Sequence, residues 1–262
     1  MQRQFAQSYG DLERWHWWFR GRLRILESVL RRELAGDRSR TILSIGCGPV
    51  AGLQWLMPFQ GTHGRVIGLD VESWRAPETP HRIGFVRGRV EQAPFASASF
   101  DVVLLLDVLE HLDDDAAGLR EAARLVRPGG LLLITVPARP GLWGAQDVVS
   151  EHRRRYTKAS LTRLLGDAAL VDCRVGYFNA LLFPLVAIVR RLRRAGGLAD
   201  RARSDFLDNR PGPLNEVLAW VLGLEQHVIN RVSLPIGVSL MAACRPPRRD
   251  EGQRLDFRIA PG

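Results

Sequence analysis

Lysine is almost missing from this chain: Lys158 is the only one, so nearly all of the positive charge comes from arginine. The formal net charge is +9 over 262 residues. Such a balance is typical of proteins that bind nucleic acid or an anionic membrane surface. A coding bias toward arginine explains the same composition equally well, so charge alone leaves the partner open.

Cysteine is scarce, and the three that occur, Cys47, Cys173 and Cys244, form no CxxC pair. This spacing predicts neither a disulfide framework nor a zinc site, and no metal is expected. We expect three small buried residues of a protein in a reducing compartment.

Long apolar runs are absent as well. The longest spans residues 180–189 and is shorter than the roughly 20 residues that cross a bilayer. The N-terminal residues contain no apolar signal core. The sequence therefore predicts a cytoplasmic protein, with peripheral contact at the inner face of a membrane as a further option.

Apolar runs and helical patterns alternate along the chain. The runs lack period-2 alternation, which is typical of a parallel sheet covered by helices on both faces. We expect an α/β fold with strands at 41–45, 65–71, 83–90, 99–107, 131–137, 170–178 and 235–246. We expect helices at 11–35, 50–59, 108–112, 115–126 and 158–169, the last capped by Thr157.

These elements divide the chain into a core and three additions. Residues 1–40 are predicted to form a helical lid, and residues 41–178 with 235–245 the core. Residues 179–234 read as a helical insertion before the last strand, and residues 246–262 as a loose tail.

The insertion begins with an apolar helix, residues 179–194, that ends in arginines and precedes a second amphipathic helix at 214–232. A helix that is apolar on nearly all faces is buried, or lies in a membrane interface with its arginines at the headgroups. Residues 180–194 therefore predict peripheral membrane contact, a cap over the active site, or the interface of a homodimer.

A glycine loop follows the first strand. Gly46, Gly48 and Gly52 come directly after residues 41–45, and Asp70 ends the next strand. Glycines let a backbone approach a ligand closely, and ligands of such sheets bind at the carboxyl ends of the strands. An acidic residue in the position of Asp70 can accept both hydroxyls of a ribose. A tight turn and a helix cap are the alternative interpretations.

Five segments in sequence carry a resemblance to a known family: LSIGCGPVAG, VIGLD, GRVEQAPF, FDVVLLLDVLEHL and RLVRPGGLLLITVP, within residues 41–137. They resemble the class I S-adenosylmethionine-dependent methyltransferases, in the branch that contains quinone-biosynthesis-type enzymes. The resemblance implies a Rossmann-like, seven-stranded, mostly parallel sheet whose last strand is antiparallel. It also implies S-adenosyl-L-methionine as cofactor and S-adenosyl-L-homocysteine as product.

The resemblance also implies a cofactor site. Its expected members are Ser44, Gly46, Cys47, Gly48, Asp70, Val71, Val90, Glu91, Asp107 and Val108.

The sequence departs from the family pattern at three places. Ser44 stands where the family usually has an acidic residue that helps to bind the methionine ammonium. Arg89 stands where an aspartate is frequent, and an arginine cannot accept a hydrogen bond from adenine. Val50 replaces a common glycine, with Gly52 as the nearest substitute.

Methyl transfer requires alignment of the acceptor, and an oxygen acceptor benefits from a base. His111, His152 and Tyr156 are the candidates for this catalytic role. His152 is equally well explained as a structural hydrogen bond, and His111 is better explained as packing. Candidate substrate contacts are Trp15, Trp18, Arg20 and Arg155.

The leading hypothesis is a methyltransferase acting on a small, apolar or lipid-linked molecule, at oxygen. An RNA methyltransferase is the second, although the chain has no Asn/Asp-Pro-Pro-Tyr motif and no evident RNA-binding domain. A catalytically silent S-adenosylmethionine-binding subunit is the third. A nicotinamide dehydrogenase is disfavoured by the glycine spacing.

Overall fold

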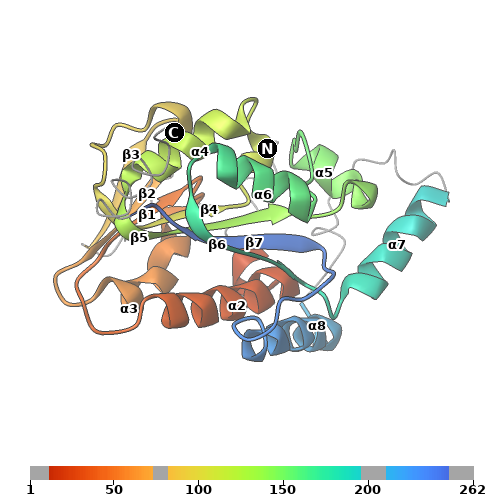
Figure 1. Cartoon of the computed structure of the whole chain (residues 1–262). Coiled ribbons are helices and arrows are strands. Elements are labelled where there is room, and N and C mark those ends of the chain that lie inside the picture. The colour runs from red at the N-terminus through yellow and green to blue at the C-terminus, as the bar shows by residue number, and fades with distance from the viewer. Residues whose placement is uncertain (1–11, 73–81, 196–210, 248–262) are drawn as a thin grey trace.

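The structure, a computed structural model, describes residues 12–72, 82–195 and 211–247. Its centre is one seven-stranded sheet in the order β3-β2-β1-β4-β5-β7-β6 (Figure 1). The strands are β1 (Thr41–Ile45), β2 (Arg65–Asp70), β3 (Ile83–Arg87), β4 (Phe100–Leu106), β5 (Val126–Pro137), β6 (Val171–Phe178) and β7 (Ser239–Arg245).

The expected topology is confirmed. Strands β1 to β5 pair in parallel, whereas β7 runs antiparallel to both β5 and β6. The strand order reverses between β1 and β4, because β2 and β3 lie on one side of β1 and β4 and β5 on the other. Ligands of doubly wound sheets bind at such a switch point.

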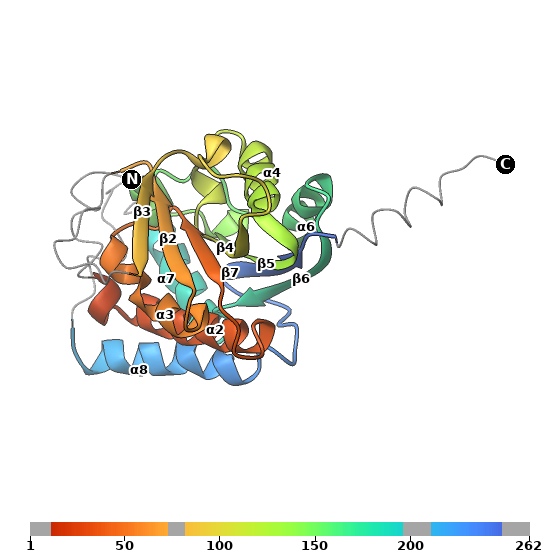
Figure 2. The ribbon, with the colours of Figure 1, turned by 90° about the vertical axis from the view of Figure 1, so that its left-hand side faces the viewer.

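Helices cover both faces of the sheet (Figures 1 and 2). One face carries α2 (Trp17–Glu33), α3 (Met57–Gln60) and α8 (Pro213–Gly223); the other carries α4 (Asp115–Leu125) and α6 (Lys158–Asp167). Successive strand residues point to opposite faces. In β4, accordingly, Val103 and Leu105 pack in the core on one side, and Val102 and Leu104 in the core on the other.

Several predicted boundaries shift. The stretch predicted as a helix at 50–59 is a 3₁₀ helix, Val50–Leu56, followed by the short α3. After β4 only a 3₁₀ turn forms, Leu109–His111, and α4 begins later because the Asp114 carboxylate accepts from the N–H of Ala117 at 2.8 Å. The predicted cap of α6 is present, since Thr157 Oγ1 accepts from the N–H of Ser160 at 3.0 Å.

The first helix is interrupted. Residues 12–15 are helical, His16 is not, and α2 begins at Trp17. His16 Nδ1 accepts from the N–H of Trp18 at 3.2 Å, so the histidine caps α2. Residues 1–11 of the predicted lid lie outside the described residues, as do residues 248–262 of the predicted tail.

The insertion contains α7 (Phe183–Ala195) and α8, separated by residues 196–210, which lie outside the described residues. Glu225 follows α8, is fully buried, and fixes the start of the insertion at residues 179–181. Its carboxylate accepts from the N–H groups of Asn179, Ala180 and Leu181 at 2.7 to 2.9 Å. No helix within the described residues is long and apolar enough to cross a membrane.

The expectation of three unpaired cysteines is wrong for two of them. Cys173 in β6 and Cys244 in β7 form a disulfide across 71 residues of sequence. The register of β6 against β7 brings the two side chains together, and that register depends on pairing between segments far apart in the chain. Cys47 is free.

Candidate active site

A cavity of about 1570 Å³ opens at the carboxyl ends of β1, β2 and β4. Residues from the start of α2 and from α7 contribute to its walls. All ten residues predicted for the cofactor line this cavity, as do His111, His152, Arg155 and Trp18.

The glycine loop after β1 needs its glycines for two different reasons. Gly46 has φ +62° and Gly48 has φ +61°, a region that other residues rarely adopt. A Cβ on Gly46 would lie 2.6 Å from Val108 Cγ2, so Gly46 is also required by close approach. A Cβ on Gly48 would meet no atom within 4 Å. The loop thus presents bare backbone at the cavity wall.

Asp70 fastens this loop to the end of β2. Its Oδ2 accepts from the N–H of Gly48 at 2.9 Å, and its Oδ1 accepts from the N–H of Glu72 at 2.9 Å. A carboxylate oxygen accepts more than one hydrogen bond. The carboxylate therefore retains capacity to accept from ligand hydroxyls while it positions the loop.

Asp107 at the end of β4 connects the sheet to α2. Its backbone has φ +59°, and its Oδ2 lies 2.7 Å from Arg22 Nη2. Thr135 Oγ1 donates to Asp107 Oδ1 at 3.1 Å and accepts from Arg22 Nη2 at 2.8 Å. The Arg22 guanidinium also lies over the Trp18 ring, 4.7 Å from its centroid. Arg22 thereby fixes α2 across the end of β4.

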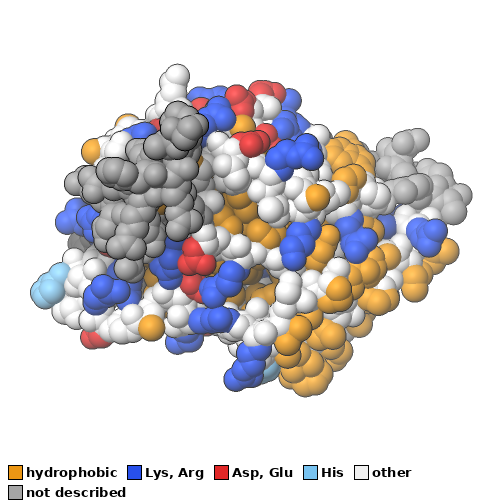
Figure 3. All heavy atoms as spheres, viewed as in Figure 1, with side chains coloured by type: hydrophobic (Ala, Val, Ile, Leu, Met, Phe, Trp, Pro, Cys, Tyr) orange, Lys and Arg blue, Asp and Glu red, His pale blue; other side chains and the backbone are white. Residues whose placement is uncertain are grey.

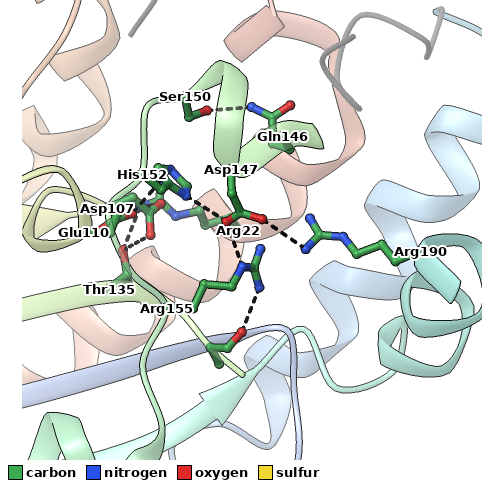
Figure 4. A network of polar contacts seen from close by, with 11 residues as sticks. Arg22, Asp107, Glu110, Thr135, Gln146, Asp147, Ser150, His152, Arg155 and Arg190 are labelled. Carbon is green, nitrogen blue, oxygen red and sulfur yellow. Dashed lines mark hydrogen bonds and ion pairs between the residues drawn. The ribbon is translucent and has the colours of Figure 1, made fainter. Parts of the chain in front are cut away.

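A second buried network surrounds Asp147 (Figure 4). Asp147 Oδ1 lies 2.9 Å from His152 Nδ1 and accepts from Arg155 Nε at 2.7 Å. Its Oδ2 accepts from the N–H of Gly144 at 2.8 Å and lies 3.6 Å from Arg190 Nη1 of α7. Burial alone would raise the pKa of Asp147, but the His152 hydrogen bond and the two arginine charges lower it to about 2.

Glu110 and His111 follow β4 and lie beside His152. Glu110 is fully buried, its carboxylate has no hydrogen-bond partner among the described residues, and its Oε1 is 4.0 Å from His152 Nε2. Burial and the nearby Asp107 raise the pKa of Glu110 well above its usual range, which favours the neutral acid. Burial, with the charge of His152, lowers the pKa of His111 to about 4.

Ligand atoms of Glu110, His111 and His152 lie within 4.8 Å of one another. This spacing would suit a cation, although the sequence predicts no metal. The same closeness places the His111 and His152 rings edge to face, with centroids 4.8 Å apart.

Three predicted residues do not reach the cavity. Tyr156 is buried elsewhere and its hydroxyl donates to Asp115 Oδ2 at 2.7 Å. Arg20 pairs with Glu216 of α8, because it lies on a different side of α2 from Trp18 and Arg22. Trp15 precedes the break at His16, and its carbonyl accepts from Asn215 Nδ2 at 2.5 Å.

The structure adds five residues that sequence reasoning missed: Glu13, Arg22, Glu110, Asp147 and Arg190. Two of them had a local signal, because Arg22 lies one turn after Trp18 and Glu110 precedes His111. Asp147 had none, since it sits in an irregular stretch and meets its partners only through the fold.

Residues 43–134 match the family model of a methyltransferase domain. A probable S-adenosylmethionine-dependent methyltransferase of Mycolicibacterium smegmatis is 32% identical over 170 residues, or 63% of each chain. A ubiquinone biosynthesis O-methyltransferase of Azorhizobium caulinodans is 30% identical over 128 residues, covering 44% of this chain and 49% of the relative. The chain spans less than two thirds of the length of these relatives.

The fold has solved counterparts. One chain of a Haloferax volcanii complex between the Trm112 methyltransferase activator and a methyltransferase superposes with a TM-score of 0.59 and 19% identity. The match covers 94% of this chain and 96% of that chain. At this identity the likeness establishes the fold alone.

Proposed function

We propose that this chain, whose residues 43–134 match the family model of a methyltransferase domain, is a class I S-adenosylmethionine-dependent methyltransferase that methylates an apolar or lipid-linked acceptor at oxygen. The observation that carries the proposal is the shared cavity. The glycine loop with Asp70 forms one part of its wall, and His152 forms another, held from behind by the buried Asp147. One cavity thus joins a cofactor subsite to a candidate base.

The residues present fit S-adenosylmethionine. The bare backbone of Gly46 and Gly48 permits close approach, and Asp70 can accept from the ribose hydroxyls. Val90 and Glu91 would lie by the adenine, and Asp107 and Val108 by the methyl-donor end. When bound, the cofactor supplies a methyl group already activated by its sulfonium.

His152 is the residue we assign as base. Its Nδ1 is held by Asp147, which leaves Nε2, on the side of Glu110, to take the proton of an acceptor hydroxyl. Asp147 is held ionised by its two arginines, so it stabilises the imidazolium that forms. Neutral Glu110 and neutral His111 add no charge that competes for this proton.

The acceptor side of the cavity is apolar with a few cationic groups. Leu185, Val186 and Val189 of α7 line it, together with Arg190 and Arg193 of the same helix. An aliphatic or aromatic acceptor would pack against these apolar side chains, and an acidic group on the acceptor would pair with the two arginines. The A. caulinodans relative, an O-methyltransferase of ubiquinone biosynthesis, supports this class of acceptor.

Peripheral membrane contact through residues 180–194 belongs to the same proposal. Leu185, Ile188 and Leu192 form one stripe along α7, and Leu181 lies in the turn just before the helix. Each of these side chains is about half exposed or more. Figure 3 shows hydrophobic side chains gathered over α7 with Lys and Arg side chains along their border. The sequence of α7 contains arginines and no acidic residue, which complements an anionic bilayer surface.

Membrane contact is tested by sedimentation with vesicles of phosphatidylcholine, with and without phosphatidylglycerol. We expect binding only to the anionic vesicles, and Ile188→Glu should abolish it. The matched control is Val148→Glu, a change at an exposed valine of α5 (Ala145–Val149) outside the cavity. A dimer in light scattering that Ile188→Glu dissociates would assign the stripe to a second copy of the chain instead.

The activity is tested with methyl-labelled S-adenosylmethionine, the purified protein and an extract of the source organism. Label that partitions into organic solvent supports an apolar or lipid-linked acceptor. Nuclease-sensitive label in water would assign RNA as the acceptor, and binding of the cofactor without turnover would indicate a silent subunit. Asp70→Ala should abolish cofactor binding, and full activity of His152→Ala would exclude the histidine as base.

A further inference from the structure

Glu13 lies next to the glycine loop, although it precedes that loop by more than thirty positions in the sequence. It lies in the helical turn before His16, and its side chain lines the same cavity as Gly46 and Gly48. A Cβ built on Gly52 would lie 2.6 Å from Glu13 Oε2 and 3.4 Å from Cδ. The absence of a side chain at Gly52 therefore makes room for this carboxylate.

The Glu13 carboxylate has little to compensate its charge. No hydrogen bond joins it to another residue in the described part of the chain. Burial raises the pKa of Glu13 to about 7, opposed only by the charge of Arg22. The Arg22 guanidinium is itself engaged by Asp107 at 2.7 Å. Removing a carboxylate from water without a hydrogen bond or partner costs free energy, so a cationic ligand group would be bound favourably there.

The other carboxylates around the loop are already engaged. Asp70 accepts from the N–H groups of Gly48 and Glu72, and Asp107 is paired with Arg22. Ser44, at the end of β1, is buried and carries no charge. Among these positions, Glu13 is the one whose carboxylate is next to the loop and still lacks a partner.

We propose that Glu13 binds the ammonium group of the methionine part of S-adenosylmethionine and so supplies the negative charge that Ser44 cannot. The inference rests on the cofactor of the proposed function. It makes the turn at residues 12–15 part of the cofactor site, reached across Gly52, and assigns this turn a binding role.

The test is calorimetric binding of three probes without turnover. S-adenosylhomocysteine carries both the ammonium and the carboxylate, its decarboxylated analogue keeps only the ammonium, and 5′-methylthioadenosine lacks both. Glu13→Gln should weaken the first two about tenfold, which corresponds to about 1.4 kcal/mol, and leave the third unchanged. Gly52→Ala should have the same selective effect because its methyl group displaces the Glu13 side chain.

Glu27→Gln is the matched control, because Glu27 pairs with Arg31 on α2 outside the cavity. Equal weakening of all three probes by Glu13→Gln would overturn the inference and make Glu13 a structural support of the loop. Unchanged binding of S-adenosylhomocysteine would overturn it as well. If the unaltered chain binds none of the probes, the cofactor assignment fails and this inference with it.

Discussion

Asp147 and His152 hold each other through two hydrogen bonds within five residues of sequence. His152 Nδ1 lies 2.9 Å from Asp147 Oδ1, and the His152 backbone N–H donates to the Asp147 carbonyl at 2.8 Å. The ring orientation is thus fixed by both the side chain and the main chain of one residue. The same carboxylate is the anchor of two arginines, one from its own loop and one from α7.

Asp147→Asn should lower kcat by about 10²–10³-fold and leave KM for the cofactor unchanged. The amide keeps the shape but cannot stabilise an imidazolium on His152, and it leaves the buried Arg155 without its charge partner. The measurement is steady-state kinetics of the folded variant, with kcat and the KM for the cofactor determined separately. Asp113→Asn, an exposed carboxylate paired with Arg153, serves as control and should behave as the parent. A kcat equal to that of the parent would reduce Asp147 to a structural role.

Arg190→Met should weaken binding of the acceptor and leave binding of the cofactor unchanged. Arg190 is the group through which α7 reaches Asp147, and it also donates to the carbonyl of Leu142. Methionine keeps much of the aliphatic stem and removes the charge, so α7 loses its polar anchor in the site. We expect a several-fold higher KM for the acceptor in steady-state kinetics and unchanged calorimetric binding of S-adenosylhomocysteine. Arg191→Met, on the same helix but outside the cavity, is the matched control.

The fold was predictable because its signals are local. Apolar runs of strand length, the glycine loop and the helix stop at Pro128 recur in the order that a doubly wound sheet requires. The predicted helix boundaries were less accurate, since side-chain caps at His16 and Asp114 decide where α2 and α4 begin. The Cys173–Cys244 pairing escaped prediction because it depends on strand register.

The sequence predicted the site residues that lie at the carboxyl end of a strand, but not those in irregular segments. Asp70 and Asp107 end β2 and β4 or follow them directly, so their meeting at one edge of the sheet could be foreseen. Asp147 and Glu13 lie in irregular segments, and three-dimensional contact alone reveals their partners. Tyr156 and Arg20 were chosen for the site by residue type alone. In the structure, Tyr156 donates to Asp115 and Arg20 pairs with Glu216 instead.

Acidification should destabilise the protein partly through His16. Burial lowers the pKa of His16 to about 4, below its ordinary value of 6.5, and its Nδ1 accepts the hydrogen bond that caps α2. A lowered pKa means that the unfolded chain binds the proton more tightly. The stability from neutral His16 is therefore complete above about pH 6.5 and is lost as the pH falls toward 4.

The difference between His16→Asn and the parent isolates this contribution, because asparagine can cap a helix but does not titrate. The free energy of unfolding is measured in urea at pH 7.5 and at pH 5. It should fall less between these two pH values for His16→Asn than for the parent. Glu13, whose pKa is raised to about 7, titrates with the opposite sign in both proteins and cancels in the difference. Equal losses in both would show that His16 does not titrate in the folded state as expected.

Gly46→Ala should separate the cost of backbone strain from that of close packing. At φ +62° any side chain is strained by about 1–2 kcal/mol, and the new methyl group would also lie 2.6 Å from Val108 Cγ2. We expect urea unfolding to show a loss of stability in Gly46→Ala that exceeds this backbone strain. Gly46→Ala combined with Val108→Ala should recover the packing part when compared with Val108→Ala by itself.

The matched control for Gly46→Ala is Gly166→Ala in α6, where a Cβ would meet nothing within 4 Å. That substitution should stabilise the protein by about 0.5–1 kcal/mol, as alanine does in a helix. Calorimetry with S-adenosylhomocysteine should show unchanged affinity for the α6 variant and lost affinity for Gly46→Ala, because its methyl group displaces the backbone that faces the cofactor. If Gly46→Ala binds the ligand as the parent does, the loop after β1 is not the surface on which the cofactor rests.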